Sequence, residues 1–197
     1  MNILTVDNIT KAYGERKLFE NASFYLAEGE KAGIIGINGT GKSTLLKIIA
    51  GLEANHCMIR FLPQNPQFDA EETVLEAVLR DNRNMDNETT IEADAKSMLT
   101  KLGVTDFTQP CGQLSGGQRK RLALVSVLLS TAEILVLDEP TNHLDLDMIE
   151  WLEGYLNRGN KTLLMVTHDR YFLDRVTNRI IELSNAKLYS YEGNYET

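Results

Sequence analysis

The sequence predicts an α/β fold built on a mostly parallel central sheet, and three stretches carry that prediction. In the first, the apolar run Lys31–Ile35 leads into the glycine-rich turn Gly36–Ser43 and then into a stretch with helical spacing that reaches Ala50. The other two are the runs Ile134–Leu137 and Thr162–Thr167, which are almost continuously apolar, as central parallel strands are.

The turn Gly36–Ser43 fits the phosphate-loop pattern G-x-x-x-x-G-K-[ST] at every fixed position. Glycines allow the backbone to curl so that successive N–H groups face phosphate oxygens, and the start of the following helix adds the positive end of its dipole. Lys42 would neutralise the β- and γ-phosphates, and the Ser43 hydroxyl would hold Mg²⁺. A glycine-rich turn can match this pattern by chance, but its position between a strand and a helix favours a site for a nucleoside triphosphate.

Two acidic residues, Asp138 and Glu139, directly follow the apolar run Ile134–Leu137. Ligands bind at the carboxyl ends of strands in open parallel sheets, so these acids can divide catalytic work between them. Asp138 would hold Mg²⁺ through water and Glu139 would polarise the attacking water, although acids at a strand end can also be purely structural. His168 follows the next central strand and is a candidate for contacting the γ-phosphate.

A second glycine-rich stretch, Leu114–Gln118, opens a helix that runs to Leu128 or Leu129. Ser115 and Gln118 have the spacing of a capping box, in which each side chain bonds the backbone N–H of the other residue. Two glycines weaken a helix start unless something approaches the backbone closely, and an anion is the natural candidate.

Local patterns predict the remaining elements. Residues 3–9 and Ala22–Leu26 are strand-like and should form an antiparallel edge that leads to the strand at Lys31–Ile35. Further elements are expected as helices at Thr73–Arg80, after a capping box at Thr89–Glu92, at Asp147–Arg158 and near Tyr171–Leu173, and as a hairpin through Ser184–Ala186.

Two further residues allow more than one interpretation. Tyr13 could stack on a nucleotide base or pack on the sheet, and its own stretch favours neither. Gln64 follows an apolar strand end, where its amide could reach a metal or a water, but it could also be an ordinary loop glutamine.

Composition narrows the class of protein. The 197 residues, of which 43% are apolar, suit one domain with a sizeable core. A formal net charge of −8 argues against a free-standing nucleic-acid binder, which usually carries a basic face.

The two cysteines, Cys57 and Cys111, are too few for a disulfide scaffold and favour a reduced, intracellular setting. The pair His56 and Cys57 is expected to be a packing pair and not a metal site. The first residues lack the pattern of a signal peptide and no apolar segment approaches the ~20 residues of a membrane span, so we expect a soluble, cytoplasmic protein.

Taken together, these motifs resemble the nucleotide-binding domain of ABC ATPases, since GINGTGKS, Gln64, LSGGQ, ILVLDEP and Thr167-His168 occur in the family's order. The resemblance implies a P-loop NTPase fold of the ABC type, with a mostly parallel central sheet, a shortened antiparallel β edge and a helical subdomain. It implies the following segments: Walker A at Gly36–Ser43, the Q-loop at Gln64, the signature at Leu114–Gln118, Walker B at Ile134–Asp138 and the D-loop at Asn142–Asp145.

The same resemblance implies an ATPase that uses ATP and Mg²⁺, and it assigns the residues of the site. The implied catalytic residues are Glu139, His168 and Gln64, and the implied metal ligands are Ser43, Gln64 and Asp138. The nucleotide would contact Tyr13, Gly36, Asn38, Gly39, Thr40, Gly41, Lys42, Ser43 and Thr44, with Ser115, Gly117 and Gln118 supplied across an interface.

Within that superfamily, Asp138–Asp145, Thr167–Leu173 and Tyr189–Tyr195 resemble the ABC-F branch. Such proteins lack membrane spans and act on ribosomes as translation or antibiotic-protection factors. The resemblance therefore implies half of a head-to-tail ATP sandwich, completed by a second copy of the chain or by a second, C-terminal ABC domain. Two alternatives stay open: the ATP-driving subunit of an ABC transporter, and an ATP-binding fragment that is inactive without its second domain.

We expect one ABC-type domain over residues 1–197, with a helical subdomain at about 70–130 inserted into the ATP-binding core. Compared with the family, the connection Gly51–Gln64 is short, which predicts a trimmed β-lobe. The polar stretch Asp81–Glu88 stands where ABC-F proteins carry a long helical arm. Because ABC-F proteins normally carry two such domains, three interpretations stay open: a fragment, a trimmed version of a longer protein, or a divergent member with a single domain.

Overall fold

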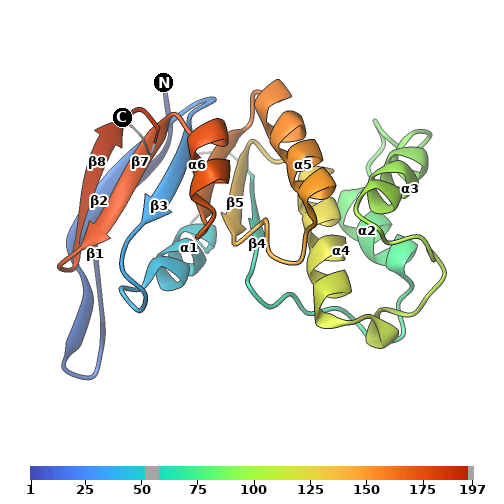
Figure 1. Cartoon of the computed structure of the whole chain (residues 1–197), viewed down its shortest axis with the longest axis horizontal. Coiled ribbons are helices and arrows are strands. Elements are labelled where there is room, and N and C mark those ends of the chain that lie inside the picture. The colour runs from blue at the N-terminus through green and yellow to red at the C-terminus, as the bar shows by residue number, and fades with distance from the viewer. Residues whose placement is uncertain (52–57, 195–197) are drawn as a thin grey trace. The chain divides into compact units, whose positions relative to one another are not determined.

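The computed structural model describes residues 1–51 and 58–194, which fold into two compact units (Figure 1). The first unit consists of Met1–Phe61, Ala132–Pro140 and Leu152–Thr197, and the second of Leu62–Thr131 and Thr141–Trp151. The expected packing pair of His56 and Cys57 lies outside the described residues.

A six-stranded sheet forms the centre of the first unit, in the order β4-β5-β6-β3-β7-β8. Its strands are β3 (Lys31–Ile35), β4 (Ile59–Leu62), β5 (Ile134–Asp138), β6 (Thr162–Val166), β7 (Arg179–Ser184) and β8 (Lys187–Glu192). The pairs β5/β6, β6/β3 and β3/β7 are parallel, whereas β7 and β8 form an antiparallel hairpin. The predicted mostly parallel sheet is therefore confirmed, with the fully buried β5 and β6 side by side in its interior.

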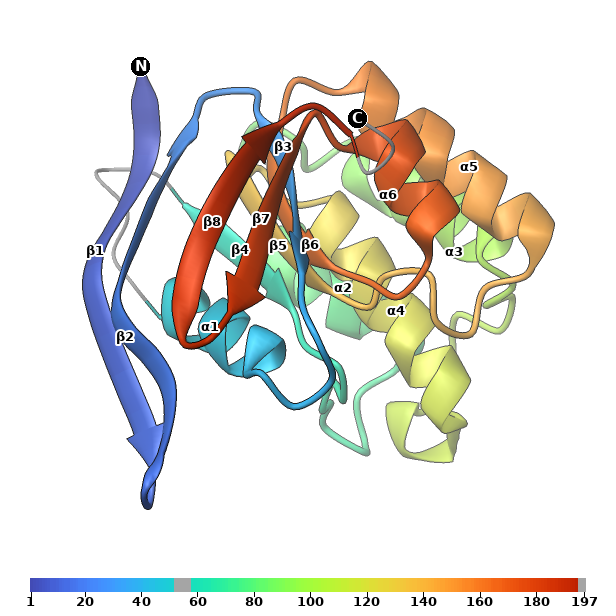
Figure 2. The same cartoon turned by 60° about the vertical axis from the view of Figure 1, so that its left-hand side comes forward.

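The first two strands, β1 (Asn2–Tyr13) and β2 (Arg16–Ala27), form a long hairpin that is drawn in blue in Figures 1 and 2. Their predicted antiparallel pairing is confirmed, but the prediction that they form an edge of the central sheet is wrong, because they make a separate two-stranded sheet. Leu4, Val6 and Phe24 turn alternate side chains into the core shared with the central strands. Burial of that apolar face as a second layer replaces hydrogen bonding to the central sheet.

The helices of the first unit pack closely on its sheet. Helix α1 (Lys42–Ala50) contacts β5 and β6. Helix α6 (Arg170–Val176) packs on β3 at Gly33, where an added Cβ would lie only 2.6 Å from the Leu173 side chain. One apolar cluster joins the hairpin, α1 and the sheet, and it includes Phe19, Ile34, Leu46, Val136 and Val166. This core holds the end of β3, and so the start of the phosphate loop, in a fixed place.

The second unit consists mainly of helices: α2 (Val74–Asn82), α3 (Ile91–Lys101) and α4 (Gly116–Leu128), with a short 3₁₀ turn η1 at Cys111–Gln113. The three α-helices pack against one another (Figure 1). A buried amide links two of them, since the Asn82 side chain donates to the Ser126 backbone carbonyl at 3.0 Å. Helix α5 (Leu146–Arg158) begins in this unit and ends in the first, where it buries Leu152 and Leu156.

The helix starts of the second unit test the capping predictions. The predicted capping box at Ser115–Gln118 is confirmed. The box predicted at Thr89–Glu92 is wrong: the N-cap of α3 is Thr90, and no side chain among the described residues caps it. The Asn87 carbonyl accepts the Thr90 N–H at 2.9 Å, so a turn leads directly into this helix. A capping box that the sequence analysis missed lies at Thr73–Glu76, at the start of α2.

Candidate functional site

The loop Gly36–Ser43 connects β3 to α1 within the first unit. Gly39 and Gly41 have φ angles of 80° and 103°, which L side chains rarely adopt, so this curl requires glycine at both positions. The Thr40 hydroxyl and backbone N–H both donate to the Ile37 carbonyl, at 2.8 and 3.2 Å. The N-cap of α1 is Gly41, and among the described residues no side chain caps this helix start. Its first amides therefore suit an anion.

The Lys42 side chain lies across the loop. Its Nζ donates to the Gly36 carbonyl at 2.7 Å and to the Ile37 carbonyl at 3.1 Å. Burial lowers the pKa of Lys42, and the negative charges of Glu139 and Asp138 oppose that shift in part. A buried ammonium group of this kind suits a polyphosphate, whose charge would compensate for its loss of solvation.

Asp138 and Glu139 lie at the carboxyl end of β5, where the sequence placed them. Asp138 is fully buried and Glu139 is 5% exposed. Glu139 has a φ of 51°, a strained conformation for a non-glycine residue that costs about 1 kcal/mol. Its N–H donates to the Val166 carbonyl of β6 at 2.7 Å, and the register of β5 on β6 pairs Asp138 with the same residue. The sheet therefore holds the Glu139 backbone next to the end of β6.

Glu139 and His168 make a two-point contact at the ends of these adjacent strands. One carboxylate oxygen of Glu139 lies 3.2 Å from His168 Nε2, and the other accepts the His168 backbone N–H, also at 3.2 Å. The His168 side chain is 67% exposed, whereas that of Glu139 is 7% exposed. The imidazole can therefore reach a ligand from solvent while the carboxylate stays shielded.

A hollow of about 390 Å³ adjoins the phosphate loop and His168. Lys42 lines it together with His168 and with two residues that the sequence analysis missed, Arg170 and Glu182. Arg170 is the first residue of α6, two positions after His168, and this closeness is the signal that could have found it. Three groups that can carry positive charge thus line one hollow beside the loop.

The oxygen donors of the first unit fit Mg²⁺. Ser43 offers a hydroxyl and Asp138 a buried carboxylate, and hard oxygen ligands are those that Mg²⁺ prefers. The negative charge of Asp138 also raises the pKa of Lys42, against the larger lowering by burial. Gln64, the third expected ligand, belongs to the second unit, where it is exposed.

The predicted signature residues lie at the start of α4 in the second unit. The Ser115 N–H donates to Gln118 Oε1 at 2.9 Å, and the Gln118 N–H donates to Ser115 Oγ at 3.2 Å. A Cβ added at Gly117 would lie 3.3 Å from the side chain of His143, in the expected D-loop. This helix start is therefore capped by its own side chains and packed against a histidine of the same unit.

The remaining predicted contacts lie near the surface of the first unit. Tyr13, at the tip of the β1–β2 hairpin, is 60% exposed. Asn38 is exposed in the loop and Thr44 is half-buried in the first turn of α1. Arg16, which was not among the predicted residues, donates from its guanidinium to the Gly39 carbonyl. A cation beside a turn is too common a pattern to have revealed this contact.

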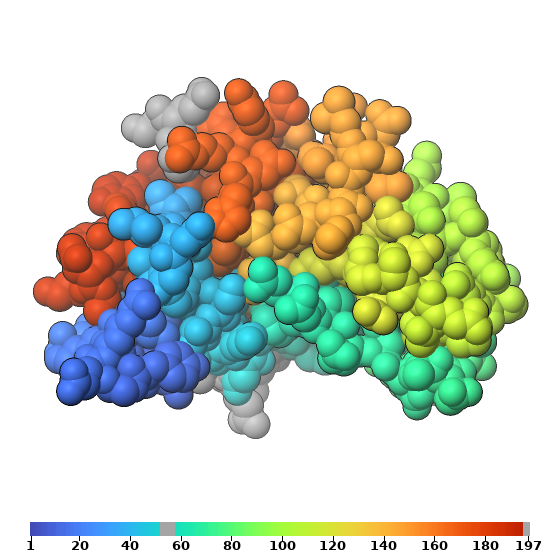
Figure 3. Space-filling model, turned by 60° about the horizontal axis from the view of Figure 1, so that its bottom comes forward, coloured from blue at the N-terminus to red at the C-terminus, as the bar shows by residue number. Residues whose placement is uncertain are grey.

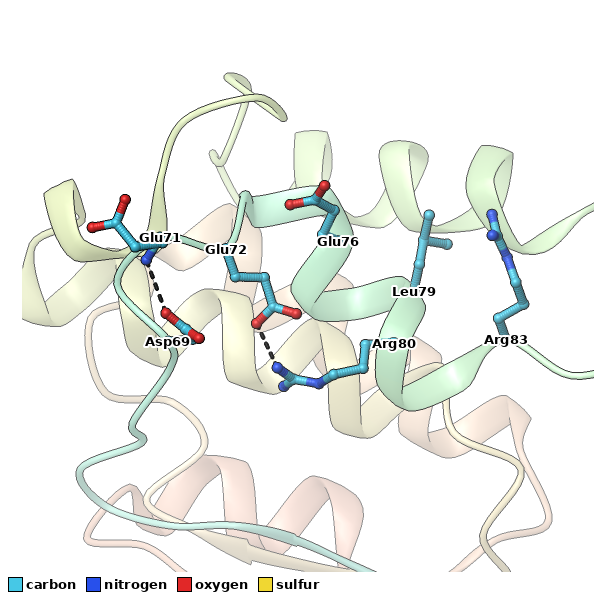
Figure 4. A pocket seen from close by; sticks show the side chains of 7 residues that line it. All are labelled: Asp69, Glu71, Glu72, Glu76, Leu79, Arg80 and Arg83. Carbon is cyan, nitrogen blue, oxygen red and sulfur yellow. Dashed lines mark hydrogen bonds and ion pairs between the residues drawn. The ribbon is translucent and has the colours of Figure 1, made fainter.

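A larger hollow, of about 880 Å³, lies in the second unit at the start of α2 (Figure 4). It is lined by Asp69, Glu71, Glu72, Glu76, Leu79, Arg80 and Arg83. Arg80 pairs with Glu72 at 2.5 Å and with Asp81 at 3.0 Å, so these charges compensate one another. None of the residues predicted to bind nucleotide lines this hollow.

Comparison with solved structures yields the same fold. The ATP-binding cassette MJ0796, solved as a dimer in a post-hydrolysis state bound to ADP and Pi, superposes with a TM-score of 0.77 at 25% sequence identity. The match covers 95% of this chain and 97% of that one, which confirms the predicted P-loop NTPase fold of the ABC type. In the described part of the chain, no helix has the length and apolar character needed to cross a membrane.

Comparison with sequences identifies the family. Residues 19–142 match the family described as ABC transporter. The ABC transporter ATP-binding protein YfmR of Bacillus subtilis (strain 168) is 44% identical over 241 residues, which cover 100% of this chain and 38% of YfmR. The ribosome protection protein VmlR of the same strain is 41% identical over 187 residues, which cover 92% of this chain and 34% of VmlR. The chain thus spans little more than a third of these relatives, and it belongs to the ABC transporter family, as an ATPase domain similar to those of the ABC-F branch.

Proposed function

We propose that this chain binds ATP and Mg²⁺ and hydrolyses ATP as one half of a head-to-tail pair of ABC domains. The observation that carries the proposal is the contact between Glu139 and His168, beside the hollow that Lys42 lines. A shielded carboxylate, an exposed imidazole and a phosphate-loop lysine are groups that can position and polarise the reactants when a phosphoryl group is transferred to water.

In the proposed mechanism, Lys42 and the first amides of α1 bind and orient the β- and γ-phosphates. Mg²⁺, held by Ser43 and Asp138, would neutralise charge on the phosphate oxygens. Glu139 polarises the attacking water, and the strained backbone that the sheet imposes keeps its carboxylate beside His168. His168 holds that carboxylate in place and contacts the γ-phosphate with its exposed ring.

The start of α4 supports the use of a second domain. Its capping box already satisfies the backbone at Ser115 and Gln118. Apart from its chain neighbours and the backbone of its own helix turn, no heavy atom of the described residues would lie within 4 Å of a Cβ added at Gly116, so packing inside the unit does not explain this glycine. The γ-phosphate of an ATP bound to another ABC domain would explain it, because an anion needs bare backbone at a helix start.

We further infer that the pair works on ribosomes rather than with a membrane transporter. The support is the likeness to VmlR, which is named a ribosome protection protein, together with the ABC-F-like stretch Asp138–Asp145. A Glu139→Gln variant should therefore sediment with bacterial ribosomes in the presence of Mg²⁺-ATP. Recovery of that variant with membranes instead of ribosomes would contradict this part of the proposal.

The first test is the solution mass of the Glu139→Gln chain, measured by light scattering with and without Mg²⁺-ATP. An amide cannot polarise water as a carboxylate does, so we expect hydrolysis to fall about a hundredfold or more while ATP stays bound and dimers accumulate. Glu28→Gln removes the same charge from an exposed turn and should behave as the wild type. Undiminished hydrolysis would exclude Glu139 as the base, and a nucleotide-bound monomer would exclude pairing of two copies.

A further inference from the structure

Figure 3 shows the β1–β2 hairpin in blue, beside the lighter blue part of the chain to which the phosphate loop belongs. The tip of the hairpin contacts this loop through a hydrogen bond that the proposed mechanism does not use. Arg16 Nη2 donates to the Gly39 carbonyl at 2.5 Å. A Cβ added at Gly39 would lie 3.6 Å from the same nitrogen, so the guanidinium covers this part of the loop. The hydrogen bond thus joins the exposed end of the hairpin to the loop expected to hold the phosphates.

Arg16 is also the cross-strand partner of Tyr13. The two residues face each other where the hairpin turns, and Gly14 between them has a φ of 58°. Lys11 Nζ lies 5.4 Å from the centroid of the Tyr13 ring and covers one of its faces. A nucleotide base would stack on the opposite face. Through this pairing, the bond from Arg16 to Gly39 connects the residue opposite Tyr13 to the phosphate loop.

The hairpin and the loop are joined by a buried apolar contact and by an exposed hydrogen bond. Below the loop, Leu18 and Phe19 are buried, and a Cβ added at Gly41 would lie 3.2 Å from each. Nearer its tip, at residues 10–17, the hairpin is exposed. There the hydrogen bond from Arg16 to the Gly39 carbonyl joins it to the loop. A two-stranded sheet alone is marginally stable, so the distance from the tip to the loop depends on this bond.

We propose that Arg16 is a positioning residue for the nucleotide base: it holds the Tyr13 ring at the distance from the phosphate loop that an intact nucleoside triphosphate spans. The inference rests on the proposed function, because it requires the loop to bind the phosphates and Tyr13 to bind the base. The loop binds phosphates with or without Arg16. Arg16 therefore adds affinity only for ligands that carry a base, by reducing the entropy lost when both contacts form together.

Calorimetric titration of ATP and of inorganic tripolyphosphate, each with Mg²⁺, tests the proposal on wild-type and Arg16→Ala chains. We expect the dissociation constant of ATP to rise about fivefold, as for the loss of one hydrogen bond, and that of tripolyphosphate to stay unchanged. Arg16→Lys keeps a cationic donor and should recover part of the ATP affinity. Lys17→Ala is the matched control: this neighbouring cation pairs with Glu20 at 2.5 Å, and its loss should change neither constant.

A double variant separates positioning from direct contact with the ligand. In a Tyr13→Ala background, Arg16→Ala should cause no further loss of ATP affinity, because no ring remains to be positioned. Three outcomes would each overturn this inference and leave the proposed function standing. They are fully additive losses of ATP affinity in the double variant, an unchanged ATP affinity in Arg16→Ala, and an equal loss of affinity for ATP and for tripolyphosphate. A wild-type chain that binds neither ligand would overturn the proposed function, and this inference with it.

Discussion

The chain enters two of its helices through glycine-rich turns that are built in opposite ways. In the phosphate loop before α1, Gly39 and Gly41 have φ angles of 80° and 103°, and among the described residues no side chain caps the helix. In the turn before α4, the N-cap Ser115 is extended, with a φ of −65°, and forms a complete capping box with Gln118. The first turn depends on glycine for its shape and leaves its amides for a ligand, whereas the second caps itself.

This difference separates two uses of glycine. In the phosphate loop, glycine provides a backbone conformation that other residues rarely adopt. Before α4, neither Gly116 nor Gly117 has a positive φ, so the reason for glycine there is space. Gly117 makes room for the His143 side chain, 3.3 Å from an added Cβ. Among the described residues, a Cβ at Gly116 would meet no heavy atom within 4 Å beyond its chain neighbours and its own helix turn. The expected contact of Gly117 with an anion stays a proposal, and the open space at Gly116 extends the proposal to that residue.

The largest effect is expected for Lys42→Ala, which tests whether the first turn is a phosphate site. Lys42 would bond the β- and γ-phosphates through a charged donor in a buried loop, so its loss should weaken ATP binding about a hundredfold in a calorimetric titration. Lys47→Ala removes an exposed cation from the last turn of the same helix and should leave binding unchanged. Equal effects of the two substitutions would mean that net charge, and not the loop, attracts the nucleotide.

Gly41→Ala tests the shape of the same loop. A side chain at a φ of 103° is strained, and its Cβ would lie 3.2 Å from the Leu18 and Phe19 side chains. We expect the free energy of unfolding, measured by urea titration, to fall by about 2 kcal/mol. Gly29→Ala is the matched control, since Gly29 has a φ of 77° but its nearest neighbour, the Asn160 carbonyl, is 3.8 Å away. It should cost about 1 kcal/mol, and an equal cost at Gly41 would show that packing plays no part.

Features encoded in a few consecutive residues could be predicted from the sequence. Strand β3 spans Lys31–Ile35 as predicted, because a short apolar run before a phosphate loop is a distinctive pattern. The predicted starts of β5 and β6, at Ile134 and Thr162, are confirmed for a related reason, since each opens a continuous apolar run. The capping box at Ser115–Gln118 is likewise encoded by four adjacent residues.

Features that depend on distant partners could not be predicted. Arg16 meets Gly39 only because the hairpin folds back onto the loop. Local propensity does not reveal the left-handed backbone of Glu139, whose N–H bonds the Val166 carbonyl of β6. The spacing that predicted a capping box at Thr89–Glu92 also occurs at Thr73–Glu76, where a box does form, so the turn before each helix decides the outcome. The chemical roles of the site residues stay predictions.

Ser115→Ala tests whether the second turn caps itself. Loss of the Oγ that accepts the Gln118 N–H should lower the free energy of unfolding by about 1 kcal/mol, even without nucleotide. Thr73→Ala removes the equivalent oxygen at the start of α2, where no role in nucleotide binding is expected, and should cost a similar amount. If Ser115→Ala leaves the stability of the nucleotide-free chain unchanged, Ser115 serves only a ligand and the comparison of the two turns fails.

The smallest effects are expected at the two glycines of the second turn. Gly116→Ala adds a methyl group in open space at the first residue of α4, so the higher helix propensity of alanine should raise the free energy of unfolding by about 0.5 kcal/mol. The same substitution should weaken ATP-dependent pairing of the Glu139→Gln chain, because the bare backbone is proposed to admit a γ-phosphate from the second domain. Unchanged pairing would leave that glycine without a role in the sandwich.

Gly117→Ala should behave differently, although the residue is adjacent and has the same helix propensity. Its Cβ would lie 3.3 Å from the His143 side chain, which must move by a few tenths of an ångström, so the gain in propensity should be cancelled or reversed. His143→Gly removes both the ring and the His143 Cβ, which itself lies 3.3 Å from the added atom, and glycine suits the φ of 65° at this position. In this background, Gly117→Ala should stabilise the chain by about 0.5 kcal/mol, as Gly116→Ala does. Urea titration of the four chains in this cycle measures the coupling. A coupling energy near zero would mean that His143 is not what requires glycine at position 117, and close approach would no longer explain the second turn.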